Sequence, residues 1–169
     1  VIWPATGNHD LHTANAAAQS GPYFDIFTLP KVGEAGGLSS GTEAYYSFNY
    51  ANVHFICLES TDASFRATGG NMATWLTNDL NANTQRWTVV YFHHPPYSKG
   101  SHDSDTETEL IQMRTNIVPI LENKKVDLVL SGHSHSYERS MMLKGHFGVE
   151  STFNSATMAV NAGSGIYPA

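Results

Sequence analysis

The stretch WTVVYFHHPPY, residues 87–97, joins an apolar run to a polar turn that begins with two histidines. Residues 87–92 form a nearly continuous apolar run, which is typical of a strand buried on both faces of a parallel sheet. The histidines that follow would lie at the carboxyl end of that strand, the edge of an α/β sheet where ligands bind. The stretch therefore predicts a central strand and a site beside it.

Two similar turns occur elsewhere in the chain. GNHD (7–10) follows the apolar residues 1–6, which are predicted to be the tail of a strand, and GHSH (132–135) follows the apolar run 126–130. Six of the nine histidines lie in or just after these three turns: His9, His93, His94, His102, His133 and His135. Independent placement would not put them all at strand ends. Histidine together with Asn and acidic oxygens suits Zn²⁺, Fe or Mn²⁺, so the pattern predicts a metal site.

Periodicity and turn residues predict the remaining elements. They are a loop over 12–41, a hairpin of 44–50 and 53–58, a helix over 71–83 with Asn71 as N-cap, a helix over 110–121 kinked near Pro119, a buried strand over 126–130, and a strand over 157–161 that runs into a glycine loop at 163–165. Strands that alternate with helices predict an α/β layered fold.

Composition narrows the class of protein. The 169 residues are 41% hydrophobic with a formal net charge of −6, which suits one domain with a sizeable core and excludes intrinsic disorder. No run reaches the roughly 18 apolar residues of a membrane span, and nine Lys and Arg residues argue against nucleic acid as the main partner. Cys57, the single cysteine, is expected to be a buried, unreactive thiol. The chain opens on Val1 inside an apparent element, so we expect a piece of a longer protein, cut at both ends.

The three turns resemble known motifs. GNHD (7–10), YFHHPPY (91–97) and GHSHSYERS (132–140) are similar to the last three motif blocks of the calcineurin-like metallophosphoesterases, and the YER extension resembles the purple acid phosphatase branch. The order and spacing of the blocks match across essentially the whole chain. The resemblance implies a layered α/β/β/α sandwich, with residues 1–169 as a C-terminal portion of its catalytic domain.

The resemblance also implies roles for individual residues. Asn8, His93 and His133 would ligate one metal ion and His135 a second, with Fe, Zn or Mn as the metals. His9 and His102 would contact the substrate phosphate. The implied activity is hydrolysis of phosphate monoesters, small molecules, by a metal-bound hydroxide at a dinuclear centre.

One departure from the family pattern concerns the carboxylates. The family's first two blocks supply two aspartates, one of which bridges the metals, and in the purple branch a tyrosine ligand. These blocks lie N-terminal to the Gly-Asn-His block, whereas residues 1–7 here contain no acidic residue. We therefore expect this chain alone to bind at most one metal ion and to show little phosphatase activity, because a preceding segment is needed to complete the site.

Two alternatives stay open at this point. One is a phosphodiesterase or nucleotide-processing member of the same superfamily. The other is a non-catalytic metal-binding, phosphate-binding or structural domain, which would follow if Val1 were the true start. Few lysines and many Ser, Thr, Asn and Gly residues favour a secreted or periplasmic location.

Several neighbouring residues have simpler explanations. His94 is expected to point away from the metal that His93 faces, and Arg139 is predicted to be a buried brace. The acidic residues 103–109 precede a helix, and interaction with its dipole explains them without metal binding.

Overall fold

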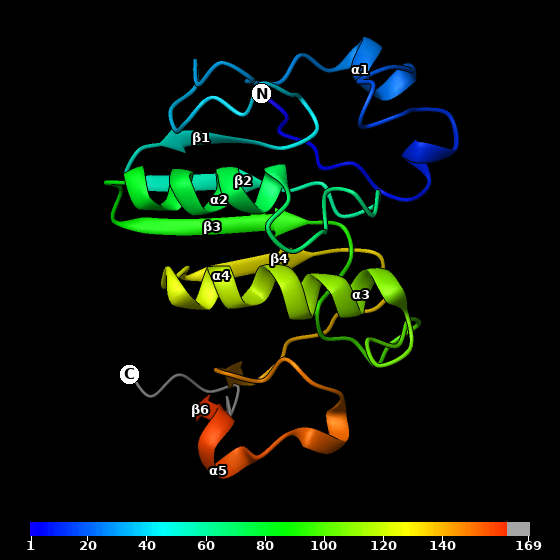
Figure 1. Cartoon of the computed structure of the whole chain (residues 1–169), viewed down its shortest axis with the longest axis vertical. Helices are drawn as coiled ribbons and strands as arrows, with labels where there is room; N and C mark the ends of the chain where they lie inside the picture. Colours follow the sequence, from blue (N-terminus) through cyan, green and yellow to red (C-terminus); the bar gives the residue numbers. More distant parts are fainter. Residues whose placement is uncertain (162–169) are drawn as a thin grey trace.

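The computed structural model describes residues 1–161, and at the centre of this part lies a four-stranded mixed sheet in the order β1-β2-β3-β4 (Figure 1). β1 (Tyr46–Tyr50) and β2 (Val53–Cys57) form an antiparallel hairpin. β3 (Trp87–Phe92) pairs in parallel with β2 on one side and with β4 (Leu128–Ser131) on the other. The predicted hairpin and the positions of both predicted parallel strands are confirmed. β3 is fully buried on one face only, because Val89 and Tyr91 are half-buried and Trp87 is exposed.

Helices connect the parallel strands and lie on one side of the sheet (Figure 1). α2 (Asn71–Ala82) joins β2 to β3. α3 (Thr108–Gln112), the π-helical segment η2 (Met113–Ile117) and α4 (Val118–Asn123) follow one another between β3 and β4. Short helices, η1 (Asp10–His12) and α1 (Pro22–Ile26), interrupt the long N-terminal loop. The alternation confirms the predicted α/β fold.

Two helix details differ from the predictions. Gly70, and not Asn71, is the N-cap of α2, and no side chain caps this helix end. Pro119 lies where η2 continues directly into α4, and the irregularity expected near this proline takes the form of the π-helical turn of η2 before it.

The core lies between the sheet and its helices. Tyr46, Ile56, Leu76, Val90 and Ile117 are fully buried there, and burial of each such side chain contributes about 1.5–3 kcal/mol. Cys57 is buried beside them and unpaired, and burial raises the pKa of its thiol to about 12. The predicted unreactive thiol is confirmed.

The N-terminal segment is not a strand, contrary to the prediction from its apolar residues. Three tyrosine hydroxyls take the place of a neighbouring strand. Tyr23 and Tyr46 donate to the carbonyl oxygen of Pro4 at 3.0 and 2.7 Å, and Tyr91 donates to that of Trp3 at 3.1 Å. Because side chains satisfy these backbone acceptors, the segment runs across the sheet without joining its ladder.

β4 lies at the edge of the sheet and is not buried, which corrects the prediction of a buried strand. Leu128, Val129 and Leu130 are 47, 37 and 51% exposed. Within residues 1–161 only β3 pairs with this strand. The apolar sequence of this segment therefore predicts a strand correctly, but it does not predict whether the strand is buried or exposed.

The chain beyond β4 forms a small separate layer. β5 (Met142–Leu143) pairs antiparallel with β6 (Ala159–Asn161), and η3 (Glu150–Thr152) and α5 (Ser155–Met158) lie between them. The predicted glycine loop at 163–165 lies outside the described residues. No helix within residues 1–161 is long and apolar enough to cross a membrane.

Candidate metal centre

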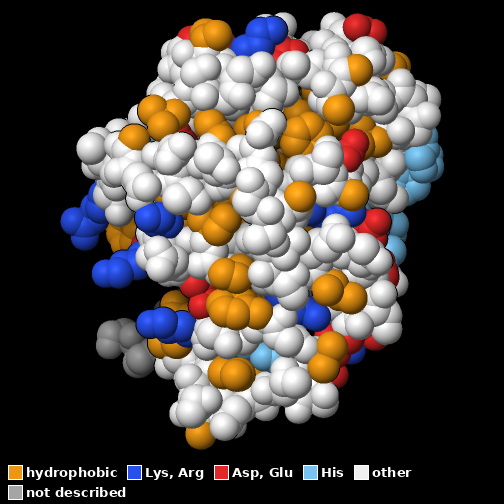
Figure 2. Space-filling view, viewed as in Figure 1, with side chains coloured by type: hydrophobic (Ala, Val, Ile, Leu, Met, Phe, Trp, Pro, Cys, Tyr) orange, Lys and Arg blue, Asp and Glu red, His pale blue; other side chains and the backbone are white. Residues whose placement is uncertain are grey.

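Histidine side chains gather along one edge of the molecule (Figure 2), the edge toward which β3 and β4 point in Figure 1. His93 follows the last residue of β3 directly, and Gly132-His133 follow β4. The Gly132 amide donates to the carbonyl oxygen of His93 at 3.0 Å, so the two turns are joined beyond the end of the sheet. Parallel pairing of two strands thus brings together residues forty positions apart.

Three of the sequence-predicted ligands meet at this edge. The Nε2 atom of His93 lies 2.8 Å from Oδ1 of Asn8 and 3.1 Å from Nδ1 of His133. Two ligand atoms bound to one tetrahedral Zn²⁺ ion at 2.0–2.1 Å lie about 3.3 Å apart. One amide oxygen and two imidazole nitrogens therefore converge as ligands of a single ion do.

The electrostatics keep these imidazoles neutral, as metal ligands must be. Burial, with help from the neighbouring His133, lowers the pKa of His93 to about 4. Burial and the nearby His102 also lower the pKa of His133. Both rings therefore offer lone pairs at neutral pH, and the donor set fits a borderline cation such as Zn²⁺.

The backbone is specialised where these residues approach one another. His133 has a φ of 66°, a left-handed conformation that is uncommon outside glycine and that marks functional sites. A Cβ atom added at Gly7 would lie 3.0 Å from the Cε1 and Nδ1 atoms of His93. A larger residue at position 7 would therefore press on the imidazole of His93, and glycine lets the Asn8 turn approach it closely.

Two carboxylates hold the Asn8 turn in place. Asp10 accepts a hydrogen bond from the Gly7 amide at 2.9 Å, and the buried Glu59 accepts one from the hydroxyl of Thr6 at 2.5 Å. Burial raises the pKa of Glu59 against the effect of its hydrogen bonds. Asp10 thus forms a hydrogen bond within its own loop.

His94 lies closer to the cluster than the sequence indicated. Its ring centroid is 4.4 Å from that of His133, and ligand atoms of His93, His94 and His133 lie within 4.8 Å of one another. Its Nδ1 atom contacts the hydroxyl of Ser60 at 3.1 Å. Burial, together with the neighbouring His93, lowers its pKa to about 3. His94 is therefore a buried, neutral neighbour of the predicted ligands.

His102 joins the cluster through its ring and through a carboxylate. Its imidazole stacks on that of His133 with centroids 3.7 Å apart, and its Nδ1 atom donates to Glu107 at 2.8 Å. Partial burial alone would raise the pKa of Glu107, but hydrogen bonds from the Asp103 amide and from His102 outweigh it and lower that pKa. Glu107 is thus an anion facing two imidazoles.

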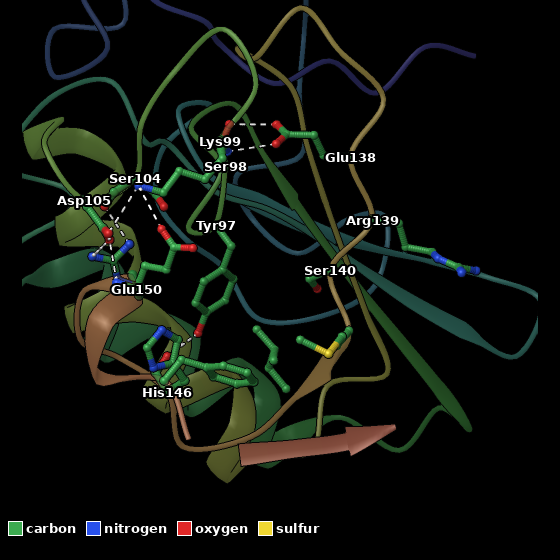
Figure 3. Close-up of a pocket in the computed structure, with 14 residues that line it drawn as sticks. Tyr97, Ser98, Lys99, Ser104, Asp105, Glu138, Arg139, Ser140, His146 and Glu150 are labelled. Atoms are coloured by element: carbon green, nitrogen blue, oxygen red, sulfur yellow. Dashed lines mark hydrogen bonds and ion pairs between the residues drawn. The ribbon is translucent and has the colours of Figure 1, made fainter. Parts of the chain in front are cut away.

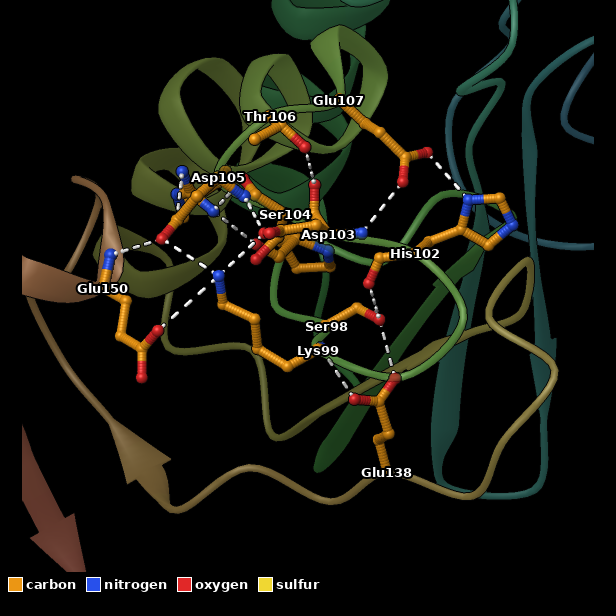
Figure 4. A network of polar contacts seen from close by, with 12 residues as sticks. Ser98, Lys99, His102, Asp103, Ser104, Asp105, Thr106, Glu107, Glu138 and Glu150 are labelled. Carbon is orange, nitrogen blue, oxygen red and sulfur yellow. Dashed lines mark hydrogen bonds and ion pairs between the residues drawn. The ribbon is translucent and has the colours of Figure 1, made fainter.

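The acidic residues 103–109 form a polar network and do more than precede a helix (Figure 4). The ammonium group of Lys99 contacts carboxylates of Asp103, Asp105 and Glu150 at 2.8, 3.3 and 3.5 Å. Glu138 accepts hydrogen bonds from the Ser98 hydroxyl and the Lys99 amide at 2.7 and 2.8 Å. These contacts fasten the loop that carries His102 at both ends.

The remaining predicted site residues lie at the rim. His9 is exposed and its ring meets that of His12 edge-on at 5.3 Å. His135 is exposed, and its backbone amide donates to the hydroxyl of Ser101 at 2.8 Å. Among the described residues, the groups of close ligand atoms contain neither ring. The roles of both residues stay predictions.

A cavity of about 300 Å³ lies behind the His102 loop (Figure 3). Tyr97 donates a hydrogen bond to the carbonyl oxygen of His146, and Phe153 packs edge-on against the ring of His146. Arg139, predicted to be a buried brace, is exposed and is one of the residues that line the cavity.

Sequence reasoning set aside two residues that the structure places at the cluster, His94 and Glu107. An alternating pattern would turn His94 away from His93, but residues 93–94 lie beyond the strand, where alternation ends. The position of Glu107 in the sequence indicates only a helix end, because its contacts with His102 and His133 arise from the folding of the chain. A carboxylate five residues after a predicted site histidine was the available signal.

Comparisons with known proteins agree with the resemblance of the motifs. A family model described as calcineurin-like phosphoesterase matches residues 2–137. Probable purple acid phosphatase 20 of Arabidopsis thaliana is 37% identical over 146 residues, and purple acid phosphatase 1 of Ipomoea batatas is 33% identical over 144. The matches cover 81 and 82% of this chain, and 32 and 28% of those proteins.

An uncharacterized protein of Mycobacterium tuberculosis is 29% identical over 161 residues, which are 87% of this chain and 29% of that protein. The chain thus spans less than a third of the length of these relatives. The family model nevertheless covers most of the chain, and the matched residues include all three histidine-bearing turns, the last of which ends at His135. The chain therefore belongs to the calcineurin-like phosphoesterase family, with purple acid phosphatases among its relatives.

Proposed function

We propose that this chain contributes the histidine-rich part of a metal-dependent phosphoesterase site, and that the whole protein hydrolyses phosphate monoesters. The observation that carries the proposal is the convergence of Asn8, His93 and His133 within 2.8–3.1 Å around the Nε2 atom of His93. Membership of the phosphoesterase family and relatives named purple acid phosphatases support it.

In this proposal Asn8, His93 and His133 hold one cation. Such a cation would activate water for attack on phosphorus and offset negative charge on the phosphoryl oxygens. His9, at the rim of the cluster, and His102, within it, donate hydrogen bonds to the phosphoryl oxygens or to the leaving group. Histidine suits this role because its ordinary pKa lies near neutral pH.

A second cation would be ligated by His135, as in a dinuclear centre. One imidazole is too weak a site at ordinary metal concentrations, and no carboxylate among residues 1–161 stands with His135 in a group of close ligand atoms. We therefore propose that the chain by itself binds at most one ion and turns over little substrate. A domain that binds metal without hydrolysis is the second candidate function, favoured by the isolated position of His135.

Substitutions in the full-length protein test these assignments. His133→Ala should lower the bound metal content, whereas His9→Ala should leave the metal content nearly intact and lower kcat for an aryl phosphate by roughly 100-fold or more. His12→Gln, at an exposed position outside the cluster, is the control for metal content. Equal metal loss from His9→Ala and His133→Ala would show that the two roles are wrongly assigned.

The choice of substrate separates the proposed activity from its alternatives. An aryl phosphate monoester should be hydrolysed faster than the corresponding aryl phosphate diester. The reverse preference would indicate a phosphodiesterase. Tight metal binding without hydrolysis of either compound would indicate the binding domain.

A further inference from the structure

One carboxylate, that of Glu107, faces a ring nitrogen of each of the two stacked imidazoles, His102 and His133. Oε2 of Glu107 accepts the hydrogen bond from Nδ1 of His102 at 2.8 Å and lies 3.6 Å from Nε2 of His133. Its other oxygen, Oε1, accepts a hydrogen bond from the Asp103 amide at 2.8 Å. Both oxygens are engaged, so the carboxylate cannot rotate without losing a bond.

The contacts of Glu107 favour one position for the proton of each ring, through a hydrogen bond from Nδ1 of His102 and through the charge that faces Nε2 of His133 at 3.6 Å. An ionised carboxylate only accepts hydrogen bonds, so a neutral imidazole that faces it carries its proton on the facing nitrogen. For His133 this leaves the lone pair on Nδ1, the atom 3.1 Å from Nε2 of His93. For His102 it leaves the free position on Nε2, on the far side of the ring from Glu107 (Figure 4).

We propose that Glu107 is a positioning residue that sets the tautomers of His133 and His102 together. It presents Nδ1 of His133 to the cation held with Asn8 and His93. It keeps the Nδ1 proton of His102 directed to itself, so Nε2 of His102 donates to the phosphate ester only when the ring carries a proton on both nitrogens. The identity of the cation and of the ester rests on the proposed function, but the tautomers are properties of this chain alone.

A helix-capping role does not explain the position of this side chain. Glu107 is the N-cap residue of α3, yet its side chain makes no hydrogen bond to the first turn of that helix. The carboxylate is directed to the imidazoles and to the Asp103 amide instead. Carboxylates that accept from the second nitrogen of a metal-binding histidine orient the ring and raise its basicity, and their loss costs about 10–100-fold in metal affinity.

Glu107→Gln in the metal-free chain tests the proposal, with Glu109→Gln as matched control. Glutamine keeps the length of the side chain and an acceptor for the Asp103 amide, but it removes the charge. Glu109 lies two residues further along the same segment and pairs with Arg66 at 3.8 Å, and among the described residues it belongs to none of the groups of close ligand atoms. Long-range ¹H–¹⁵N NMR at a pH where the rings are neutral reads the tautomer of each histidine.

In the unmodified chain and in Glu109→Gln, His102 should be protonated at Nδ1 and His133 at Nε2. In Glu107→Gln, His102 should move to the form protonated at Nε2, which free histidine prefers in water. Zn²⁺ affinity, measured by calorimetry, should fall by roughly 10–100-fold in Glu107→Gln and stay unchanged in Glu109→Gln.

Unchanged tautomers in Glu107→Gln would overturn the proposal, whatever happens to metal affinity. A chain that binds no Zn²⁺ would contradict the proposed function instead, while the NMR result would still decide the role of Glu107. If Glu107→Gln does not fold, Glu107→Asp replaces it. That variant keeps the charge but withdraws the carboxylate, so the same change in His102 is expected, and an unaltered His102 would again refute the proposal.

Discussion

At the scale of single residues, burial prepares the histidines for their proposed role. The pKa of His93 is about 4 and that of His94 about 3, in each case chiefly because burial disfavours the charged ring. These histidines therefore stay neutral in mildly acidic solution, where an exposed histidine would be protonated. A site built from them would keep its ligands available at acidic pH.

The lowered pKa values predict how stability depends on pH in the metal-free chain. In the unfolded chain histidine titrates near its ordinary value of 6.5, whereas folded His94 takes up a proton only near pH 3. Between these values the unfolded state binds more protons, so the free energy of unfolding should fall as the pH falls below about 6.5.

Chemical denaturation across this pH range measures the effect. His94→Gln should reduce the fall in stability, because the substituted residue no longer takes up a proton on unfolding. His12→Gln, at an exposed position, should leave the pH dependence as it is in the unmodified chain. Parallel pH profiles for His94→Gln and the unmodified chain would contradict the assignment of the effect to His94.

At the scale of elements, the sequence predicts those strands whose neighbours are other strands of the sheet. The run over residues 87–92 reads as a central strand because it is almost continuously apolar, and the strand does pair on both sides, with β2 and β4. The hairpin before it follows from two β-rich runs around a short turn. The segment 1–6 has the same apolar character, but tyrosine hydroxyls from three distant elements satisfy its carbonyls. No local pattern reveals such partners.

The N-terminal segment also provides a test at this scale, because its tyrosine contacts hold the turn that carries Asn8. Tyr46 is fully buried, and its hydroxyl lies 2.7 Å from the Pro4 carbonyl oxygen and 3.1 Å from the hydroxyl of Tyr91. Tyr46→Phe removes these hydrogen bonds of a buried hydroxyl, whereas Tyr23 still donates to Pro4 and Tyr91 to Trp3. The substitution should therefore lower the free energy of unfolding by about 1 kcal/mol in denaturant titration.

Tyr50→Phe is the matched control, since Tyr50 belongs to the same strand but is 75% exposed. Its effect should be within about 0.5 kcal/mol. Equal losses of stability from the two variants would mean that the hydroxyl of Tyr46 does not hold the N-terminal segment.

At the scale of the whole molecule, the site draws on turns from three separate parts of the chain. Its position at one edge of the sheet was predictable, because parallel strands end on the same side. The presence of His94 and Glu107 in the site was not predictable, because their approach depends on the paths of the loops beyond the strands. Exposure of β4 was likewise hidden, since an apolar run indicates a strand without showing what covers it.

The central claim is that Asn8, His93 and His133 form one cation site within this chain. The most direct test is the number of Zn²⁺ ions bound per chain, measured by calorimetry together with elemental analysis, for the 169-residue chain and for His93→Ala. The account predicts one tightly bound ion in the unmodified chain, no second one, and loss of the bound ion in His93→Ala. Two tightly bound ions, or binding that survives His93→Ala unchanged, would contradict it.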